Sequence, residues 1–183
     1  MLTAQQKKQE NIVEYLLYMY CLEDMIRSLA CDANRVCKEL VPSLAPNASF
    51  IPSYEQWYSA LCQELLTSGK KTKGHLAELE EIATELVFLH QTLMVVKPDE
   101  KYQGLYETAS VSIDEFSQKS GMENHHPVLI SIHAMHMKLQ LKLRGKDISN
   151  ETEMAFDSMR IMLAYLAVEY KKMRSGSWDL HPN

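Results

Sequence analysis

The positions of proline and glycine limit the fold of this chain more than any other feature of its sequence. Proline lacks a backbone N–H and disrupts helix interiors and central strands, whereas glycine commonly ends a helix. All of the prolines lie at the edges of segments with helical periodicity: Pro42, Pro46, Pro52, Pro98, Pro127 and Pro182. Four glycines are placed in the same way: Gly69, Gly74, Gly121 and Gly145. This pattern predicts a series of helices joined by short links.

Between these positions, apolar residues recur every three or four residues, as one face of a helix requires. The sequence predicts long helices over residues 3–29, 53–68, 75–96, 99–120, 127–144 and 150–174, and a short helix over residues 32–40. Thr3 and Ser53 each have a glutamine three residues later, which is typical of a helix start. The last helix is apolar around most of its circumference between Met159 and Val168, as in a helix at the centre of a bundle or in an oligomer interface.

These segments predict an all-α protein. We expect a single-domain bundle of five to seven helices over residues 1–174, followed by a mobile tail over residues 175–183. A chain of 183 residues suits one domain, and a domain of this size buries about 70% of its unfolded surface. A core of that extent needs neither disulfides nor a structural metal.

Charge and cysteine usage exclude several classes of protein. The net charge is −5, and acidic and basic residues are mixed along the chain, so we expect neither nucleic acid nor a membrane surface as a partner. No run of about 18 apolar residues could span a membrane. Met1 to Glu10 contains no apolar leader, and the cysteines lack C-x-x-C spacing. We therefore expect a cytoplasmic protein with reduced thiols.

Glu23 is the first candidate for a functional residue. On a helix it projects between Leu16 and Met19, inside the apolar face, where an unpaired carboxylate would be costly. Arg27 lies one turn later and is the expected partner, whereas Asp24 is expected to point toward solvent. The first interpretation is a structural ion pair, and the alternative is a carboxylate that faces a ligand.

The histidines are the second candidates. His133 and His136 lie one turn apart and form a polar ridge with Gln140 in the segment 127–144. Two such imidazoles can bind a metal, but a protein site usually needs three or four ligands. His75 and His90 could supply them, although no spacing shows that they do. The first interpretation is structural histidines; the alternative is a metal-binding or enzymatic site in a polar core, drawing on Glu23, Arg27, His75, His90, His133 and His136.

Three further patterns are weaker. Glu123 to His126 has the E-x-x-H spacing of di-iron bundles, but it lies between Gly121 and Pro127, where the chain turns, so we reject it. The three lysines between Gly69 and Gly74 lack a phosphate-binding-loop frame and are interpreted as a solvated connector. An aromatic-rich region is interpreted as core packing, with a small-ligand pocket as the alternative. Its members are Tyr15, Tyr18, Tyr20, Tyr54, Trp57 and Tyr58.

Several strings of residues resemble a known family. The string EYLLYM that begins at Glu14, followed by EDMIR from Glu23, is similar to the start of a bacterial family described only as a domain of unknown function. The strings GHL from Gly74 and LAYLAVEYK from Leu163 resemble it too. The likeness extends from about Gln5 to Arg174. It implies a small all-helical cytoplasmic protein of about 180 residues, with no assigned activity or ligand.

The interpretation that follows is a non-enzymatic helical protein that acts through protein contacts, with its own copies as one partner and another protein as the alternative. The apolar last helix and the two apolar faces of the segment 127–144 favour it. No cofactor, metal or catalytic residue is predicted, and the sequence leaves enzymatic activity open. The rival interpretations are the polar-core metal site or enzyme described above and a small-ligand-binding bundle.

Overall fold

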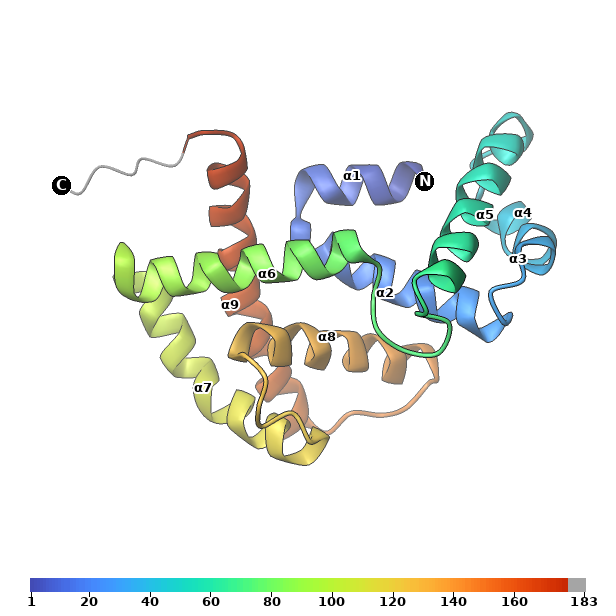
Figure 1. Ribbon diagram of the computed structural model, residues 1–183. Coiled ribbons are helices and arrows are strands. Elements are labelled where there is room, and N and C mark those ends of the chain that lie inside the picture. The colour runs from blue at the N-terminus through green and yellow to red at the C-terminus, as the bar shows by residue number, and fades with distance from the viewer. Residues whose placement is uncertain (178–183) are drawn as a thin grey trace.

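The computed structural model describes residues 1–177, and they fold as helices in sequence order (Figure 1). The helices are α1 (Leu2–Glu10), α2 (Ile12–Ser28), α3 (Ala33–Glu39), α4 (Val41–Leu44), α5 (Ile51–Thr67), α6 (Ala77–Gln91), α7 (Glu100–Ser120), α8 (Pro127–Leu143) and α9 (Asn150–Arg174), with a 3-10 turn η1 (Ala48–Phe50) and a π-helical turn η2 (Thr92–Val96). No strand occurs in this part of the chain. The predicted all-α fold is confirmed.

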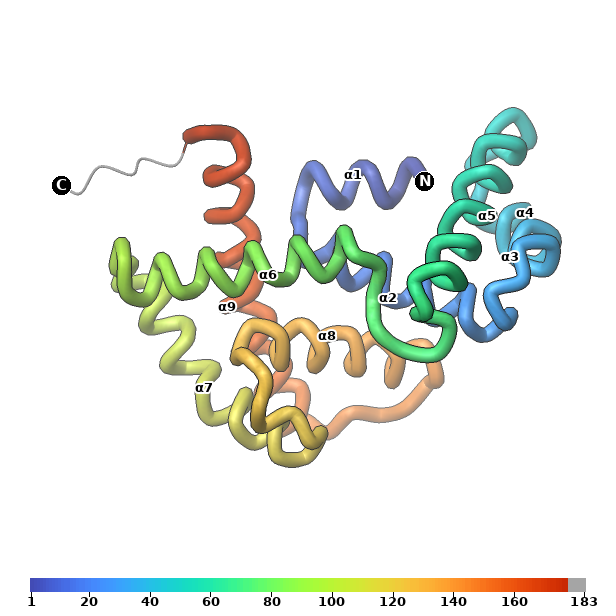
Figure 2. The backbone as a smooth tube through the Cα atoms, in the orientation of Figure 1, coloured from blue at the N-terminus to red at the C-terminus, as the bar shows by residue number. Residues whose placement is uncertain are grey.

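Helix α9 lies at the centre of the packing. It contacts α2, α6, α7 and α8, while α3, α4 and α5 contact one another at the end of the molecule opposite α7 (Figure 2). The buried apolar residues form one continuous core. Within residues 1–177, no helix is long and apolar enough to cross a membrane. Most of the predicted mobile tail, residues 178–183, lies outside the described residues.

The first predicted helix, residues 3–29, is in fact two helices. Asn11 has an extended backbone, with φ −152° and ψ 109°, and its side-chain oxygen accepts hydrogen bonds from the N–H groups of Val13 and Glu14. This is the geometry of a helix N-cap, which satisfies donors that a new helix leaves free. The prediction of an uninterrupted helix was therefore wrong, because a capping asparagine starts α2 at Ile12.

Two other expected starts also differ. Thr3 does not cap α1, whose N-cap is Met1, and α5 begins at Ile51, before Ser53, with Pro52 in its first turn. The helix boundaries predicted at Gly121 and Pro127 are found. Gly121 ends α7 in a left-handed conformation, with φ 67°, and Pro127 is the first residue of α8. These residues place the turn that carries His125 and His126 beside the start of α8.

Candidate functional site

Glu23 joins α2 to the start of α6. Its side chain is buried, at 1% exposure, and Oε2 lies 2.6 Å from Nδ1 of His75. The other oxygen, Oε1, accepts a hydrogen bond of 2.9 Å from the backbone N–H of Leu76, the N-cap residue of α6. The carboxylate thus satisfies a helix-end donor and orients an imidazole at the same time.

Arg27 is the cationic partner of this carboxylate, as predicted. Its Nη2 lies 3.5 Å from Oε2 of Glu23, and its Nη1 lies 3.1 Å from Oδ1 of Asp24. The guanidinium also donates hydrogen bonds to the backbone oxygens of Lys70 and Gly74. Arg27 therefore holds the loop between α5 and α6 against α2, which places His75 above Glu23.

Asp24 contradicts its prediction, because it does not simply point toward solvent. Its Oδ2 accepts a hydrogen bond of 2.6 Å from the side-chain amide of Gln140 and lies 3.1 Å from Nε2 of His136. Sequence reasoning placed Asp24 on the outer face of α2 and did not know that α8 would cover it. The spacing of His136 and Gln140, one turn apart on α8, was the signal that these two residues share a partner.

A hollow of about 430 Å³ opens beside this network. We call it the histidine hollow, and its lining residues include Tyr20, His75, Glu80, His125, Leu129 and His133. The Tyr20 ring stacks on the His75 ring, with centroids 3.5 Å apart, and meets the His136 ring edge-on at 5.6 Å. The structure thus brings His75 and His133 to one hollow, with Glu23 and Arg27 behind His75.

Burial favours the neutral forms of two of these imidazoles, His133 and His136. Burial, with added repulsion from His75 and His125, lowers the pKa of His133. Burial is also the largest cause that lowers the pKa of His136, against the opposing effect of Asp24. The hydrogen bond from Lys70 lowers the pKa of the Glu80 carboxyl, whose oxygen lies 2.5 Å from the Lys70 ammonium.

His90 does not join this group. Its Nδ1 lies 2.8 Å from the Tyr102 hydroxyl, and its ring contacts Tyr106 and His126 edge-on at the end of α6 farther from His75. Burial and the nearby His126 lower the pKa of His90 to about 4. The candidate histidines therefore do not all converge, because His75 precedes the start of α6 and His90 lies near its other end.

The remaining candidates are placed as follows. Across residues 1–177, no group of three or more His, Cys, Asp or Glu residues could hold a metal ion. His126 caps α8, in keeping with the turn expected for the E-x-x-H string. Tyr15 donates to Glu78, and Tyr58 packs between Tyr54 and Trp57, away from the histidine hollow.

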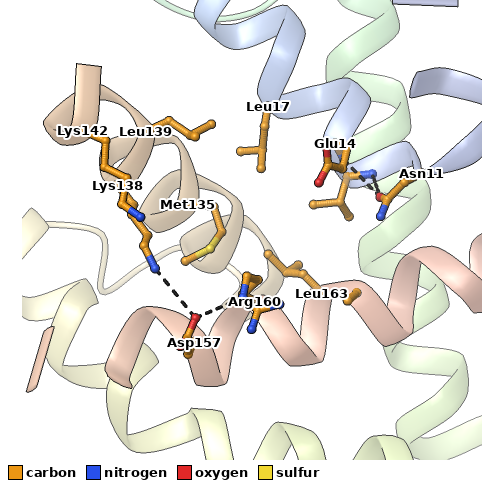
Figure 3. A pocket seen from close by; sticks show the side chains of 12 residues that line it. Asn11, Glu14, Leu17, Met135, Lys138, Leu139, Lys142, Asp157, Arg160 and Leu163 are labelled. Carbon is orange, nitrogen blue, oxygen red and sulfur yellow. Dashed lines mark hydrogen bonds and ion pairs between the residues drawn. The ribbon is translucent and has the colours of Figure 1, made fainter. Parts of the chain in front are cut away.

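A second, larger depression of about 550 Å³ lies between α2, α8 and α9 (Figure 3). Its lining includes Leu17, Leu139 and Ala164, and charged side chains stand along it. Asp157 lies 3.0 Å from Nε of Arg160 and 3.8 Å from Nζ of Lys138, so these charges are largely paired. This depression borders the outer face of α9.

The outer face of α9 exposes apolar residues at regular intervals. Met154 is 74% exposed, Ile161 is 45% exposed and Val168 is 54% exposed. They are spaced seven residues apart, and Ala164, also exposed, lies between the last two. Residues seven apart lie on the same side of a helix. We call this set of four residues the α9 stripe.

One comparison with known proteins gives a match, and it covers all of the residues that the structure describes. Residues 1–177 match the model of a family whose description is "Domain of unknown function (DUF4924)". Searches of curated proteins and of solved structures give no match. The match covers nearly all of the chain, and it agrees with the resemblance that the strings from Glu14 and Glu23 indicated.

Proposed function

This chain belongs to the family described as Domain of unknown function (DUF4924), a membership that assigns no activity, and we propose from its exposed surface that it is a non-enzymatic protein that assembles with a second copy of itself. The α9 stripe is the observation that carries the proposal. A regular row of exposed apolar residues on one helix is typical of a helix that packs against another helix.

The charges at the two ends of α9 favour a second copy as the occupant. The first turn carries Glu151 and Glu153, and the last turn carries Lys171, Lys172 and Arg174. Glu153, Lys172 and Arg174 form ion pairs within the chain, so the charge pairing between copies rests on Glu151 and Lys171. If two copies of α9 pack antiparallel, the acidic start of one lies beside the basic end of the other, and apolar residues meet at the centre. A parallel pair would place like charges side by side.

A two-fold axis near Ile161 satisfies this arrangement. It places Met154 of one copy near Val168 of the other, and Glu151 near Lys171. Such an interface is self-complementary, as the interfaces of two-fold dimers are. The stripe and its flanking charges extend over about 30 Å from Glu151 to Lys171, at 1.5 Å per residue. This contact is narrow, so we expect a dimer in the micromolar range rather than an obligate one.

The direct test is the mass of the protein in solution. Sedimentation equilibrium at about 100 µM should show a dimer for the full chain, well above a micromolar dissociation constant. Ile161→Glu should give a monomer because it places two carboxylates at the axis. Val111→Glu is the matched control, since Val111 is also an exposed β-branched apolar residue but lies on α7, outside the stripe. It should leave the dimer unchanged.

Charge exchange tests the antiparallel orientation. Glu151→Lys and Lys171→Glu should each weaken the dimer, because each places like charges opposite one another. The double variant Glu151→Lys with Lys171→Glu should restore it. A full-length chain that stays monomeric at about 100 µM would refute the proposal, and a dimer that none of these variants affects would place the interface elsewhere.

The proposal also concerns the cellular compartment in which the protein acts. We propose that it acts in a bacterial cytoplasm, which free cysteines support: Cys31 and Cys62 are buried thiols, and burial raises their pKa values, which keeps them protonated and unreactive. Thiol labelling of the protein isolated from cells, after denaturation has exposed the buried thiols, should find all four cysteines reduced.

A further inference from the structure

We propose that the histidine hollow binds a small organic acid, with its carboxylate against Tyr20, His75 and His133 and its apolar body against the wall of α8. This proposal concerns a different face from the α9 stripe and does not depend on dimer formation. The groups that carry it are an unused hydrogen-bond donor, an oriented imidazole, two further imidazoles and an apolar wall.

Tyr20 supplies the unused donor. Its side chain is 7% exposed, yet its contacts among the described residues are ring contacts, and none of these residues forms a hydrogen bond with its hydroxyl. Burial above all, with Glu23 and Glu80 adding to it, raises its pKa. The hydroxyl thus stays protonated, and because Tyr20 lines the open hollow, its oxygen is accessible to a ligand that accepts a hydrogen bond there.

His75 supplies an oriented second donor. Glu23 lies at Nδ1, so the ring is fixed, and Nε2 is the nitrogen left for a ligand. Because Glu23 accepts the hydrogen on Nδ1, Nε2 donates to an anion in the hollow only when the ring also carries a hydrogen on Nε2. Arg27 balances the charge of Glu23 from the other side, and the stacked Tyr20 ring prevents His75 from turning.

The other charged groups around the hollow are consistent with an anion. His133 from α8 and His125 from the preceding turn face it, and their mutual repulsion is one cause of the lowered pKa of His133. An anion between them would relieve that repulsion. Glu80 of α6 faces the hollow but is paired with Lys70. His136 and Asp24 pair with each other behind Tyr20.

The rest of the lining suits a small apolar body. Ala83, Met122, Leu129 and Ile132 line the same hollow. Ligand sites are typically lined mostly by apolar side chains, with a few polar groups that fix orientation. A carboxylate on an aromatic or short aliphatic body matches both parts of this lining, whereas inorganic phosphate matches only the polar part.

Benzoate is a suitable probe for the full-length protein. We expect benzoate to shift the NMR signals of the His75 and His133 rings. It should bind about tenfold more tightly at about pH 6 than at about pH 8, because burial keeps His133 neutral at the higher pH and the benzoate anion binds its protonated form, while a carboxylate is ionised at both. Benzamide, which has the same shape without the charge, should bind at least about tenfold more weakly. Inorganic phosphate should bind more weakly than benzoate.

Two variants test the donors. Tyr20→Phe keeps the ring that stacks on His75 and removes the hydroxyl, so it should weaken benzoate binding about tenfold without changing the fold. His133→Gln should weaken binding and reduce its pH dependence. The matched control is Tyr106→Phe, since Tyr106 contacts His90, remote from the hollow. Equal affinity for benzoate and benzamide, or equal benzoate binding by the Tyr20 and Tyr106 variants, would overturn the proposal, as would no binding at millimolar concentration.

Discussion

Oε2 of Glu23 lies 2.6 Å from Nδ1 of His75, 52 residues later in the chain. The contact ties α2 to the residue that precedes the N-cap of α6, and it sets the direction in which the imidazole faces the hollow. Because the carboxylate is buried and shared between Arg27 and His75, we expect the stability of the protein to depend on it more than on its surface ion pairs.

Glu23→Gln should lower the free energy of unfolding by about 3 kcal/mol, because it leaves Arg27 and His75 without their buried counter-charge. Urea denaturation followed by circular dichroism measures this. Glu14→Gln is the control: Glu14 is exposed and pairs with Lys7, so its loss should cost less than about 1 kcal/mol. Equal losses in the two variants would show that Glu23 is no more than a surface charge.

Stability should fall as the solution becomes acidic, with His90 as one cause. Its folded pKa is about 4, below its ordinary value of about 6.5, so the unfolded chain binds a proton first. The contribution of His90 is therefore intact above about pH 6.5 and decreases toward pH 4, by at most about 3 kcal/mol. His90→Gln should show a smaller loss between about pH 7 and 5 than the natural chain does, and identical pH profiles would contradict this.

Asn11→Ala should destabilise the protein by about 1 kcal/mol, because it removes the oxygen that caps α2. Asn124→Ala, in the exposed turn before α8, should change stability by less than about 0.5 kcal/mol. Thermal and urea denaturation of both variants test the break between α1 and α2. If Asn11→Ala were neutral, or if it stabilised the protein, then residues 2–28 would behave as a single helix in solution.

Arg27→Lys should loosen the loop between α5 and α6. Lysine keeps the charge but lacks the fork that reaches the backbone oxygens of both Lys70 and Gly74. Tryptic cleavage between Lys70 and Lys73 in the folded protein should rise by about tenfold, which corresponds to about 1.4 kcal/mol of local opening. Arg35→Lys is the control, since Arg35 is exposed and pairs with the exposed Glu39 on the same helix. Unchanged cleavage in Arg27→Lys would mean that other contacts hold the loop.

Much of the fold follows from local chemistry. The helix boundaries at Gly121 and Pro127 could be predicted from the sequence, because glycine and proline favour helix ends through their own backbone properties. The Glu23–Arg27 ion pair could be predicted because residues four apart are neighbours on the surface of a helix. Asn11 carried a usable signal too, as an asparagine with Glu14 three residues later, although the apolar periodicity on both sides concealed it.

Only part of the candidate site could be predicted from the sequence, because its contacts join distant parts of the chain. Periodicity shows which face of α2 is buried, but not that His75 would cover Glu23 or that His136 and Gln140 would cover Asp24. Those contacts join residues 52 and 116 positions apart, and they depend on the crossing of helices, which the packing of many side chains decides together. The chain alone specifies its helices and their apolar faces; the meeting of Tyr20, His75 and His133 around one hollow exists only after those helices have packed.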